Sequence, residues 1–325
     1  MEHIKFFVDI GKNDVAVAGG KGASLGEMTR AGIAVPPGFV VTAGAFDRFV
    51  TETHLDEEIL ARLREVNPAD TNSVDRVSNV LRDVIHDTRM PPDLTIDIFR
   101  AFDTLNAELV AVRSSATAED SSIASWAGEL ETYLNTTRDS VVDKVKICWS
   151  SLFTPRALFY RHEKNLIGHY VSVAVVIQKM VQSEVSGIAF TVHPVTEDRD
   201  QMIIEAGWGL GEAIVGGQIT PDSYIVSKSQ MAILDINIGS QTRKLMKTIK
   251  HENNKTTESS ANEWVELSAA ESERQKLTGR QIMVVAAACK KIEAHYGFPC
   301  DIEWAMTAGE LFITQSRPIT TLKNK

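Results

Sequence analysis

The sequence contains few cysteines and lacks several features that would define its class. Three cysteines occur among 325 residues, at positions 148, 289 and 300, and none belongs to a Cys-x-x-Cys pair. This wide spacing indicates neither a structural zinc site nor a disulfide framework. No apolar stretch reaches the roughly 18 residues that a membrane span requires, and no signal peptide opens the chain. These absences predict a cytoplasmic protein with no membrane partner.

Positive charge is also scarce. The chain has 34 lysines and arginines against 43 acidic residues, a net charge of −9, and no basic run. This balance argues against a nucleic-acid partner. It leaves room for a nucleotide site, which needs only a local cluster of cations. The length is too great for one small core, so we expect two or three packed units.

The most informative stretch covers residues 109–134. The apolar run Leu109–Val112 predicts a buried strand. It is followed by Arg113, Ser114 and other small hydroxylated residues. A guanidinium beside hydroxyls and free amides suits a polyphosphate. Gly128, further on, lacks a side chain and lets backbone approach a ligand. The alternative is a serine-rich surface loop with one exposed arginine.

A second stretch places a lysine among glycines. Gly19-Gly20-Lys21-Gly22 leads into a segment of helical character. Lys21 at such a helix entry suits phosphate, because amide groups and the positive end of the helix dipole converge there. The spacing is not that of the GxxxxGK[ST] loop. A glycine turn with a solvated lysine is the alternative.

The middle of the chain predicts a strand over residues 173–181. Its end, Gln178-Lys179-Met180, can present backbone groups to an adenine ring, with the Met180 side chain packed on its face. An ordinary core strand is the alternative. Residues 239–263 are polar and poor in aromatics, so we expect a mobile segment there. A long helix follows, with Leu277, Val284 and Ile292 on its expected buried side.

The C-terminal stretch predicts a hairpin that carries polar side chains. Asp301 and Glu303 are two apart on one expected strand, and Gln315 and Arg317 are two apart on the next. A turn at 308–309 would bring Glu303 and Gln315 together as oxygen ligands for Mg²⁺. Arg317 would lie beside them for a phosphate. A hairpin with exposed charges is the alternative.

Nine motifs, in order, together resemble one family. They are GGKGASLGEM, VPPGFVVTAGAF, AVRSSATAED, WAGELETYL, CWSSLFTPRALFYR, VAVVIQKMV, SGIAFTV, GWGLGEAIVGG and DIEW…LFITQSRPIT. The chain resembles the N-terminal ATP-binding domain of the phosphoenolpyruvate synthase / pyruvate phosphate dikinase family, from about residue 9 to residue 321. Rifampin phosphotransferase and the phenylphosphate and cresol-phosphate synthases share that domain.

The resemblance implies an α+β, ATP-grasp-like fold of two lobes with ATP in the cleft between them. We place the N-terminal lobe at residues 1–190 and the C-terminal lobe, with the metal-binding hairpin, at 191–325. The implied cofactors are ATP and Mg²⁺. The residues implied for phosphate binding and catalysis are Lys21, Arg113 and Arg317. Gly128 to Thr132 are implied for the loop over the polyphosphate, with Ser114 beside Arg113. Gln178, Lys179, Met180 and Val181 are implied for the adenine, and Glu212 for the ribose or the metal. Glu303, Gln315 and Asp301 are implied for the metal.

The family's reaction cleaves ATP to AMP and phosphate and passes a phosphoryl group to a histidine on a mobile domain. Our first hypothesis is a catalytic subunit that needs a separate phosphohistidine-carrying subunit or domain. The small-molecule acceptor, first expected to be a phenol or alkylphenol, would be bound by that partner. The second is an excised domain of a phosphoenolpyruvate synthase or rifampin phosphotransferase. The third is a non-catalytic adenine-nucleotide sensor.

Two segments depart from the family pattern. Residues 121–128 read Ser-Ser-Ile-Ala-Ser-Trp-Ala-Gly where relatives usually have Leu-Pro-Asp-Ala-Ser-Phe-Ala-Gly, which puts the docking of this loop to a partner in question. His193 stands where relatives usually have Asp. It lies outside the glycine- and threonine-rich setting of the family's carrier histidine, so we do not assign it that role.

Overall fold

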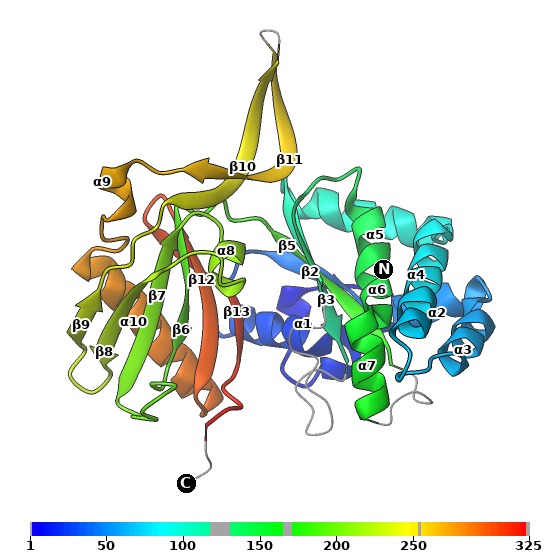
Figure 1. Ribbon diagram of the computed structural model, residues 1–325, viewed down its shortest axis with the longest axis horizontal. Coiled ribbons are helices and arrows are strands. Elements are labelled where there is room, and N and C mark those ends of the chain that lie inside the picture. The colour runs from blue at the N-terminus through cyan, green and yellow to red at the C-terminus, as the bar shows by residue number, and fades with distance from the viewer. Residues whose placement is uncertain (1, 118–130, 165–170, 253–254, 323–325) are drawn as a thin grey trace. The chain divides into compact units, whose positions relative to one another are not determined.

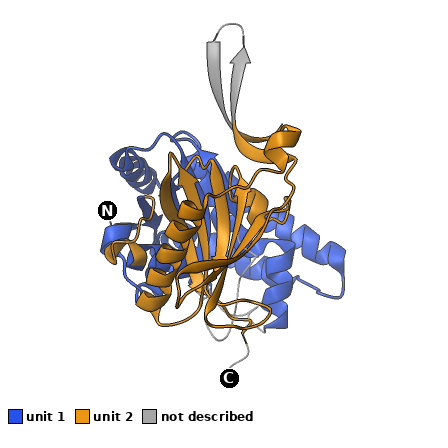
Figure 2. Cartoon of the chain, turned by 90° about the vertical axis from the view of Figure 1, so that its left-hand side faces the viewer, with its two compact units in different colours: residues 1–27, 37–180 blue, residues 28–36, 181–325 orange. Residues whose placement is uncertain are grey.

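The computed structural model describes residues 2–117, 131–164, 171–252 and 255–322, without the side chains of 248–261. The chain divides into two compact units, coloured separately in Figure 2. The first comprises Met1–Glu27 and Pro37–Met180, and the second Met28–Pro36 and Val181–Lys325. Each unit has its own sheet and helices, described in turn below.

In the described part of the first unit, five strands form one sheet in which every neighbouring pair is antiparallel. The spatial order is β1-β2-β5-β3-β4 (Figure 1). The strands are β1 (Ile4–Phe6), β2 (Gly38–Val41), β3 (Val110–Ala116), β4 (Thr132–Thr136) and β5 (Val173–Lys179). Residues 173–178 of β5 are all buried, as the continuous apolar run predicted for a strand covered on both faces.

Helices of the first unit are α1 (Val15–Arg30, its last residues in the second unit), α2 (Ala43–Glu52), α3 (Leu55–Arg64), α4 (Thr71–Asp87), α5 (Pro92–Leu105), α6 (Val141–Ser150) and α7 (Pro155–Glu163). Their starts carry ordinary helix signals. The Asp70 side chain accepts a hydrogen bond from the Asn72 amide at α4, and Pro92 opens α5. The apolar sides of α2 to α7 share one core with β3 and β5, in which Phe46 and Phe49 pack on Trp149.

The described second unit is built on six antiparallel strands in the order β13-β12-β6-β7-β8-β9. They are β6 (Val185–Phe190), β7 (Gln201–Trp208), β8 (Asp222–Ser227), β9 (Ala232–Asn237), β12 (Cys300–Thr307) and β13 (Glu310–Pro318). Helix α10 (Gly279–Tyr296) contacts β7, β9 and β12. Two short helices, α8 (Glu212–Val215) and α9 (Ala269–Ser272), complete the described helices of this unit.

The long helix α10 forms as expected, but its buried face is rotated from the predicted one. Thr278 and Gln281 make a capping box at its start. The buried positions include Ile282, Val285 and Ile292, whereas Val284 is 44% exposed. The prediction that Val284 lies in the core was wrong, because the buried stripe of α10 passes through Val285, the next residue.

Residues 239–263 correct another expectation. Much of the segment expected to be mobile forms β10 (Arg243–Glu252) and β11 (Lys255–Glu266), which pair antiparallel with each other as a separate two-stranded sheet. Figure 1 shows them as a projecting arm. The polar sequence hid these strands because a two-stranded ribbon buries little surface and shows no alternation of apolar and polar residues.

The two compact units meet at residues 180 and 181, whereas the expected lobe limit lay between residues 190 and 191. Strand β6 pairs with β7 and β12, so residues 185–190 belong to the sheet of the second unit. Residues 28–36 also join that unit, in which the Ile313 amide donates to the Ala34 carbonyl. Among the described helices, none is both long and apolar enough to span a bilayer.

Candidate nucleotide-binding site

The glycine-rich segment of the first unit sits against strand β3. Helix α1 begins at Val15 and breaks at Gly19, whose φ of 67° and ψ of 173° are open only to glycine. A Cβ at Gly19 would overlap the Ser115 hydroxyl and carbonyl. The Gly22 amide donates to the Ser115 hydroxyl at 3.3 Å. Lys21 therefore lies at a helix restart that is held directly on the strand carrying Arg113.

Arg113 and Ser114 lie at the buried centre of the first sheet. Arg113 is 8% exposed and pairs with Thr132 of β4 and Val176 of β5. The amide and hydroxyl of Ser114 both donate to the Glu131 carbonyl, at 3.1 and 3.0 Å. Arg113 is therefore not the exposed arginine that the alternative predicted.

Electrostatics place Lys21 near the same strands. Burial raises the pKa of the Cys148 thiol, and the charge of Glu131 raises it further. The positive charges of Lys144 and Lys21 oppose this increase. Since such effects weaken with distance, the ammonium of Lys21 and the carboxylate of Glu131 share the surroundings of Cys148. Lys21 and Arg113 both belong to the first unit.

The segment predicted to frame adenine is tightly bonded. Gln178 is 3% exposed on β5, between Gly38 of β2 and Ala111 of β3. The amides of Lys179 and Met180 donate to the carbonyls of Pro37 and Leu109, at 2.8 and 3.0 Å. These amides are already engaged, so their availability to a base is lower than expected. Val181 begins the second unit.

In the second unit, the predicted hairpin is confirmed. Strands β12 and β13 turn through 308–309, where Ala308 and Gly309 both have positive φ. Glu303 and Gln315 are register partners, so their side chains share one face of the sheet. The opposite face packs under α10 through Ile302 and Ile204. Glu303 and Asp301 lie half-buried on the face that α10 does not cover.

Asp301 and Arg317 form an ion pair beside the Glu303–Gln315 pair. The Arg317 guanidinium donates through Nε and Nη2 to Asp301 Oδ2, both at 2.8 Å. Burial raises the pKa of Asp301, while Arg317 opposes the shift. The carboxylate expected near the metal is therefore already engaged by the arginine expected to contact phosphate.

Sequence reasoning missed one carboxylate on this face. Glu205 of β7 and Glu303 of β12 are both register partners of Ile188 on β6, so the three side chains point the same way. The pKa of Glu205 is raised by burial and by the charge of Asp301. The signal was present in the sequence, since Glu205 is the one charged residue in the strand-like run Met202–Ala206.

The other predicted residues are placed as follows. Glu212 opens α8, and its carboxylate accepts a hydrogen bond from Asn262 of β11 at 3.2 Å. Gly128 lies outside the described residues. Among the residues with described side chains, no three His, Cys, Asp or Glu gather as a metal site.

Nearly the whole chain is similar to known proteins. Residues 15–325 match the family model "Pyruvate phosphate dikinase, AMP/ATP-binding domain". The chain is 45% identical to a probable phosphoenolpyruvate synthase of Archaeoglobus fulgidus, over 99% of this chain and 42% of that protein. It is 42% identical to one of Methanothermobacter thermautotrophicus, with 99% and 46% covered. Phosphoenolpyruvate synthase of Pyrococcus furiosus is 41% identical, with 99% and 44% covered.

The chain therefore belongs to the pyruvate phosphate dikinase AMP/ATP-binding domain family. It spans less than half the length of these three curated relatives. A solved D-alanine–D-alanine ligase of Bacillus anthracis with ATP matches at 8% identity and TM-score 0.26, over 69% of this chain and 54% of the ligase. The expected α+β, ATP-grasp-like fold class is confirmed, with family membership and two mixed helix–sheet units in agreement.

Proposed function

We propose that this chain is the ATP-binding catalytic part of a dikinase-type phosphotransferase. It binds Mg²⁺-ATP, cleaves it to AMP and phosphate, and passes a phosphoryl group to a histidine on a separate carrier domain or subunit. The observation that carries the proposal is the Glu303–Gln315 pair beside Arg317 on the face that α10 leaves uncovered. Two hard oxygen ligands next to a guanidinium suit a metal-bound polyphosphate.

Each unit contributes one set of groups. In the first, Lys21 and Arg113 neutralise phosphate charge, and Gln178–Met180 frame the adenine. Ser114 of β3 and Thr132 of β4 contribute to nucleotide binding beside Arg113. In the second, Val181 continues that frame and Glu212 serves the ribose or the metal. Glu303 and Gln315 hold Mg²⁺, and Asp301 orients Arg317. Gly128, which falls within the residue range of the first unit, belongs to the loop over the phosphates. When bound, Mg²⁺ supplies charge neutralisation of the transferring group.

The carrier histidine belongs to the partner. His193 accepts hydrogen bonds at Nδ1 from the amides of Val195 and Thr196, at 3.3 and 3.2 Å. This geometry gives His193 a turn-stabilising role. For the acceptor we propose pyruvate, because the relatives reported above carry the name phosphoenolpyruvate synthase. These names lend no support to the phenolic acceptor that we first expected.

The test is Mg²⁺-dependent phosphoryl transfer to an added histidine-carrying partner, with the Glu303→Ala variant. We expect transfer to fall at least ~100-fold, as for other groups that stabilise transferring charge, with only a modest loss of nucleotide affinity. Glu310→Ala is the matched control, because Glu310 is an exposed carboxylate at the turn of the same hairpin. Unchanged transfer in Glu303→Ala would remove Glu303 from the metal site. Supplying pyruvate or phenol then identifies the acceptor.

A further inference from the structure

A pocket of about 400 Å³ lies in the second unit, at the base of the β10–β11 arm. Its walls come from residues 182–184, residues 208–210, the start of β10 and the segment around α9. The volume falls within the range of small-molecule sites. Within the described residues, the lining includes none of the residues proposed above to hold the nucleotide or the metal.

The pocket is also separated from the carboxylate face by the pleat of the sheet. Trp208, which lines it, is a register partner of Val185, and Val185 pairs with Met306. Trp208 is three residues from Glu205, so the two side chains point to opposite faces of β7. The pocket therefore adjoins the face of the sheet that α10 covers, away from Glu303 and Glu205.

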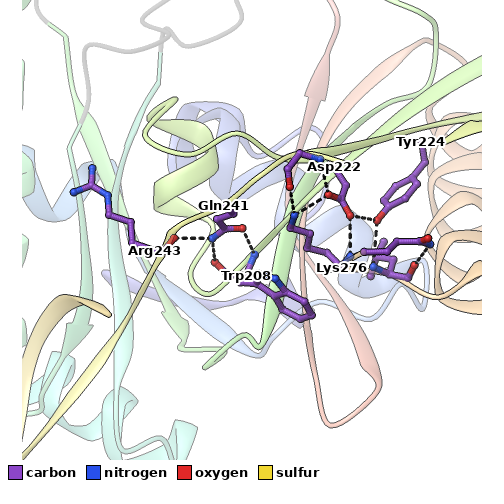
Figure 3. A network of polar contacts seen from close by, with 9 residues as sticks. Trp208, Asp222, Tyr224, Gln241, Arg243 and Lys276 are labelled. Atoms are coloured by element: carbon purple, nitrogen blue, oxygen red, sulfur yellow. Dashed lines mark hydrogen bonds and ion pairs between the residues drawn. The ribbon is translucent and has the colours of Figure 1, made fainter. Parts of the chain in front are cut away.

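Backbone contacts hold the walls in place. The Gln241 side chain, 1% exposed, accepts from the Trp208 amide at 2.8 Å and donates to the Trp208 carbonyl at 2.9 Å (Figure 3). The Leu210 amide donates to the Leu245 carbonyl at 2.9 Å. Gly209, with φ of 90°, permits this approach, because a Cβ there would overlap the Leu245 carbonyl. The pocket is thus built from fixed backbone.

The chemistry of the lining favours an anion. Lys244, Lys247 and Arg274 bring three positive charges to the pocket of a protein whose net charge is −9. Of the two lining carboxylates, Glu271 accepts hydrogen bonds from the amide and hydroxyl of Ser268. Glu184 accepts weakly from the Ala308 amide at 3.4 Å. The lining therefore carries one more positive than negative charge. Glu271, the carboxylate with the stronger hydrogen bonds, caps helix α9.

The lining also offers a flat and an apolar surface. The Arg274 guanidinium lies 5.0 Å from the centre of the Trp208 ring. Leu210, Met246 and Leu267 supply aliphatic walls. An arginine stacked on an indole presents its donors in a fixed plane, which suits an oxyanion attached to a planar or apolar body.

We propose that this pocket is a second ligand site, distinct from the nucleotide site, for a small organic oxyanion with a planar or apolar body. The anionic group contacts Lys244 and Arg274, and the body lies among Trp208, Leu210 and Leu267. Carboxylates and phosphate esters share this chemistry. The inference stands on the pocket alone and goes beyond the proposed function.

The probe is phenylphosphonate, titrated calorimetrically into the full chain, with benzoate as the carboxylate arm. Methylphosphonate lacks the planar body and benzyl alcohol lacks the charge. We expect phenylphosphonate or benzoate to bind at least tenfold more tightly than both controls, with a change in Trp208 emission that is lost in Trp208→Phe. The tighter of the two oxyanions identifies the preferred class.

Three variants decide the location. Lys244→Gln/Arg274→Gln should weaken binding at least tenfold and leave ATP affinity unchanged, whereas Arg280→Gln, at an exposed position outside the lining, should bind as the wild type does. Met246→Glu, which adds a negative charge at a partly exposed wall, should weaken binding similarly and decides the matter if the double variant is unfolded by circular dichroism. Unaltered probe affinity in the folded variants, or competitive displacement of the probe by ATP, would overturn the proposal. Unaltered probe affinity has no bearing on Mg²⁺-ATP binding, whereas displacement by ATP would mean that the nucleotide itself occupies this pocket.

Discussion

The buried Asp222–Lys276 ion pair offers the sharpest test of the packing in the second unit. Lys276 Nζ lies 2.8 Å from Asp222 Oδ1, and both side chains have no exposed surface. The carboxylate also accepts from the Tyr224 hydroxyl at 2.7 Å and from the amides of Lys276 and Gly239, at 2.8 and 3.0 Å (Figure 3). The pair thus ties the start of β8 to the segment between α9 and α10.

Replacing Lys276 by Met removes the cation and leaves Asp222 buried with three neutral donors. The Gly239 carbonyl also loses its donor from Lys276 Nζ. Removing one partner of a buried pair costs about 3–5 kcal/mol, because the remaining charge has lost its compensation. We therefore expect Lys276→Met to lower the free energy of unfolding by that amount. The double variant Asp222→Asn/Lys276→Met should lose less than the sum of the single losses.

The assay is urea unfolding followed by tryptophan emission and far-ultraviolet circular dichroism. Lys290→Met is the matched control, since Lys290 is exposed and donates to the Lys228 carbonyl, so its loss should stay below about 1 kcal/mol. A loss below about 1 kcal/mol for Lys276→Met would show that water reaches the pair, and the account of a dry network would be refuted. Additive single and double losses would refute the coupling.

Three further predictions concern backbone and charge. Gly19→Ala should lower the free energy of unfolding by about 2–4 kcal/mol, because Gly19 has positive φ and a Cβ there would overlap Ser115. Gly32→Ala is the control, since Gly32 has a similar φ and no neighbour within 4 Å, and it should cost about 1 kcal/mol. Equal losses in urea unfolding would contradict the overlap. Gly209→Ala should weaken phenylphosphonate binding at least tenfold, because a Cβ there displaces β10 from the pocket wall; wild-type affinity would show that the wall adapts. The raised pKa of Glu205 means that this carboxyl binds its proton more tightly in the folded chain than in the unfolded chain. The free energy of unfolding of the wild type should therefore fall, relative to that of Glu205→Gln, as the pH rises from the ordinary pKa of 4.5 through the raised pKa of the folded chain. Since Glu205 is half-exposed, that difference should stay below about 1 kcal/mol, and a difference that grows toward acid pH would reverse our assignment of the shift.

Local patterns predicted much of the fold because the elements that they describe bury one clear face. The apolar run of β5, the alternation in β12 and the breaks at 308–309 each appear in the structure as expected. The phase of α10 was misjudged, because its apolar residues at 282, 284 and 285 permit two overlapping stripes. The arm of β10 and β11 escaped prediction because its polar sequence lacks the alternation of apolar and polar residues that indicates a strand.

Part of the candidate site could be predicted from local sequence patterns, and the rest depends on contacts between distant segments. Residues two apart on a strand share a face by geometry alone, so the Glu303–Gln315 hairpin could be predicted. The bond between Gly22 and Ser115 joins positions 93 residues apart, and no local pattern carries that information. Glu205 was missed because its relation to Glu303 depends on the order of the strands, with β6 between them.

The ladder between β12 and β13 shifts by one residue directly after Glu303, so that Trp304 pairs with Ile313 rather than with Thr314. This extra residue sets the phase in which Gln315 meets the carboxylate. In an uninterrupted ladder Thr314 would lie opposite Glu303, and Gln315 would pair with Ile302 and point towards the helix-covered side. Within this hairpin, the 308–309 turn is the place where chain length can change while the Glu303–Gln315 pair stays intact. In descendants of this sequence we therefore expect insertions and deletions at that turn first.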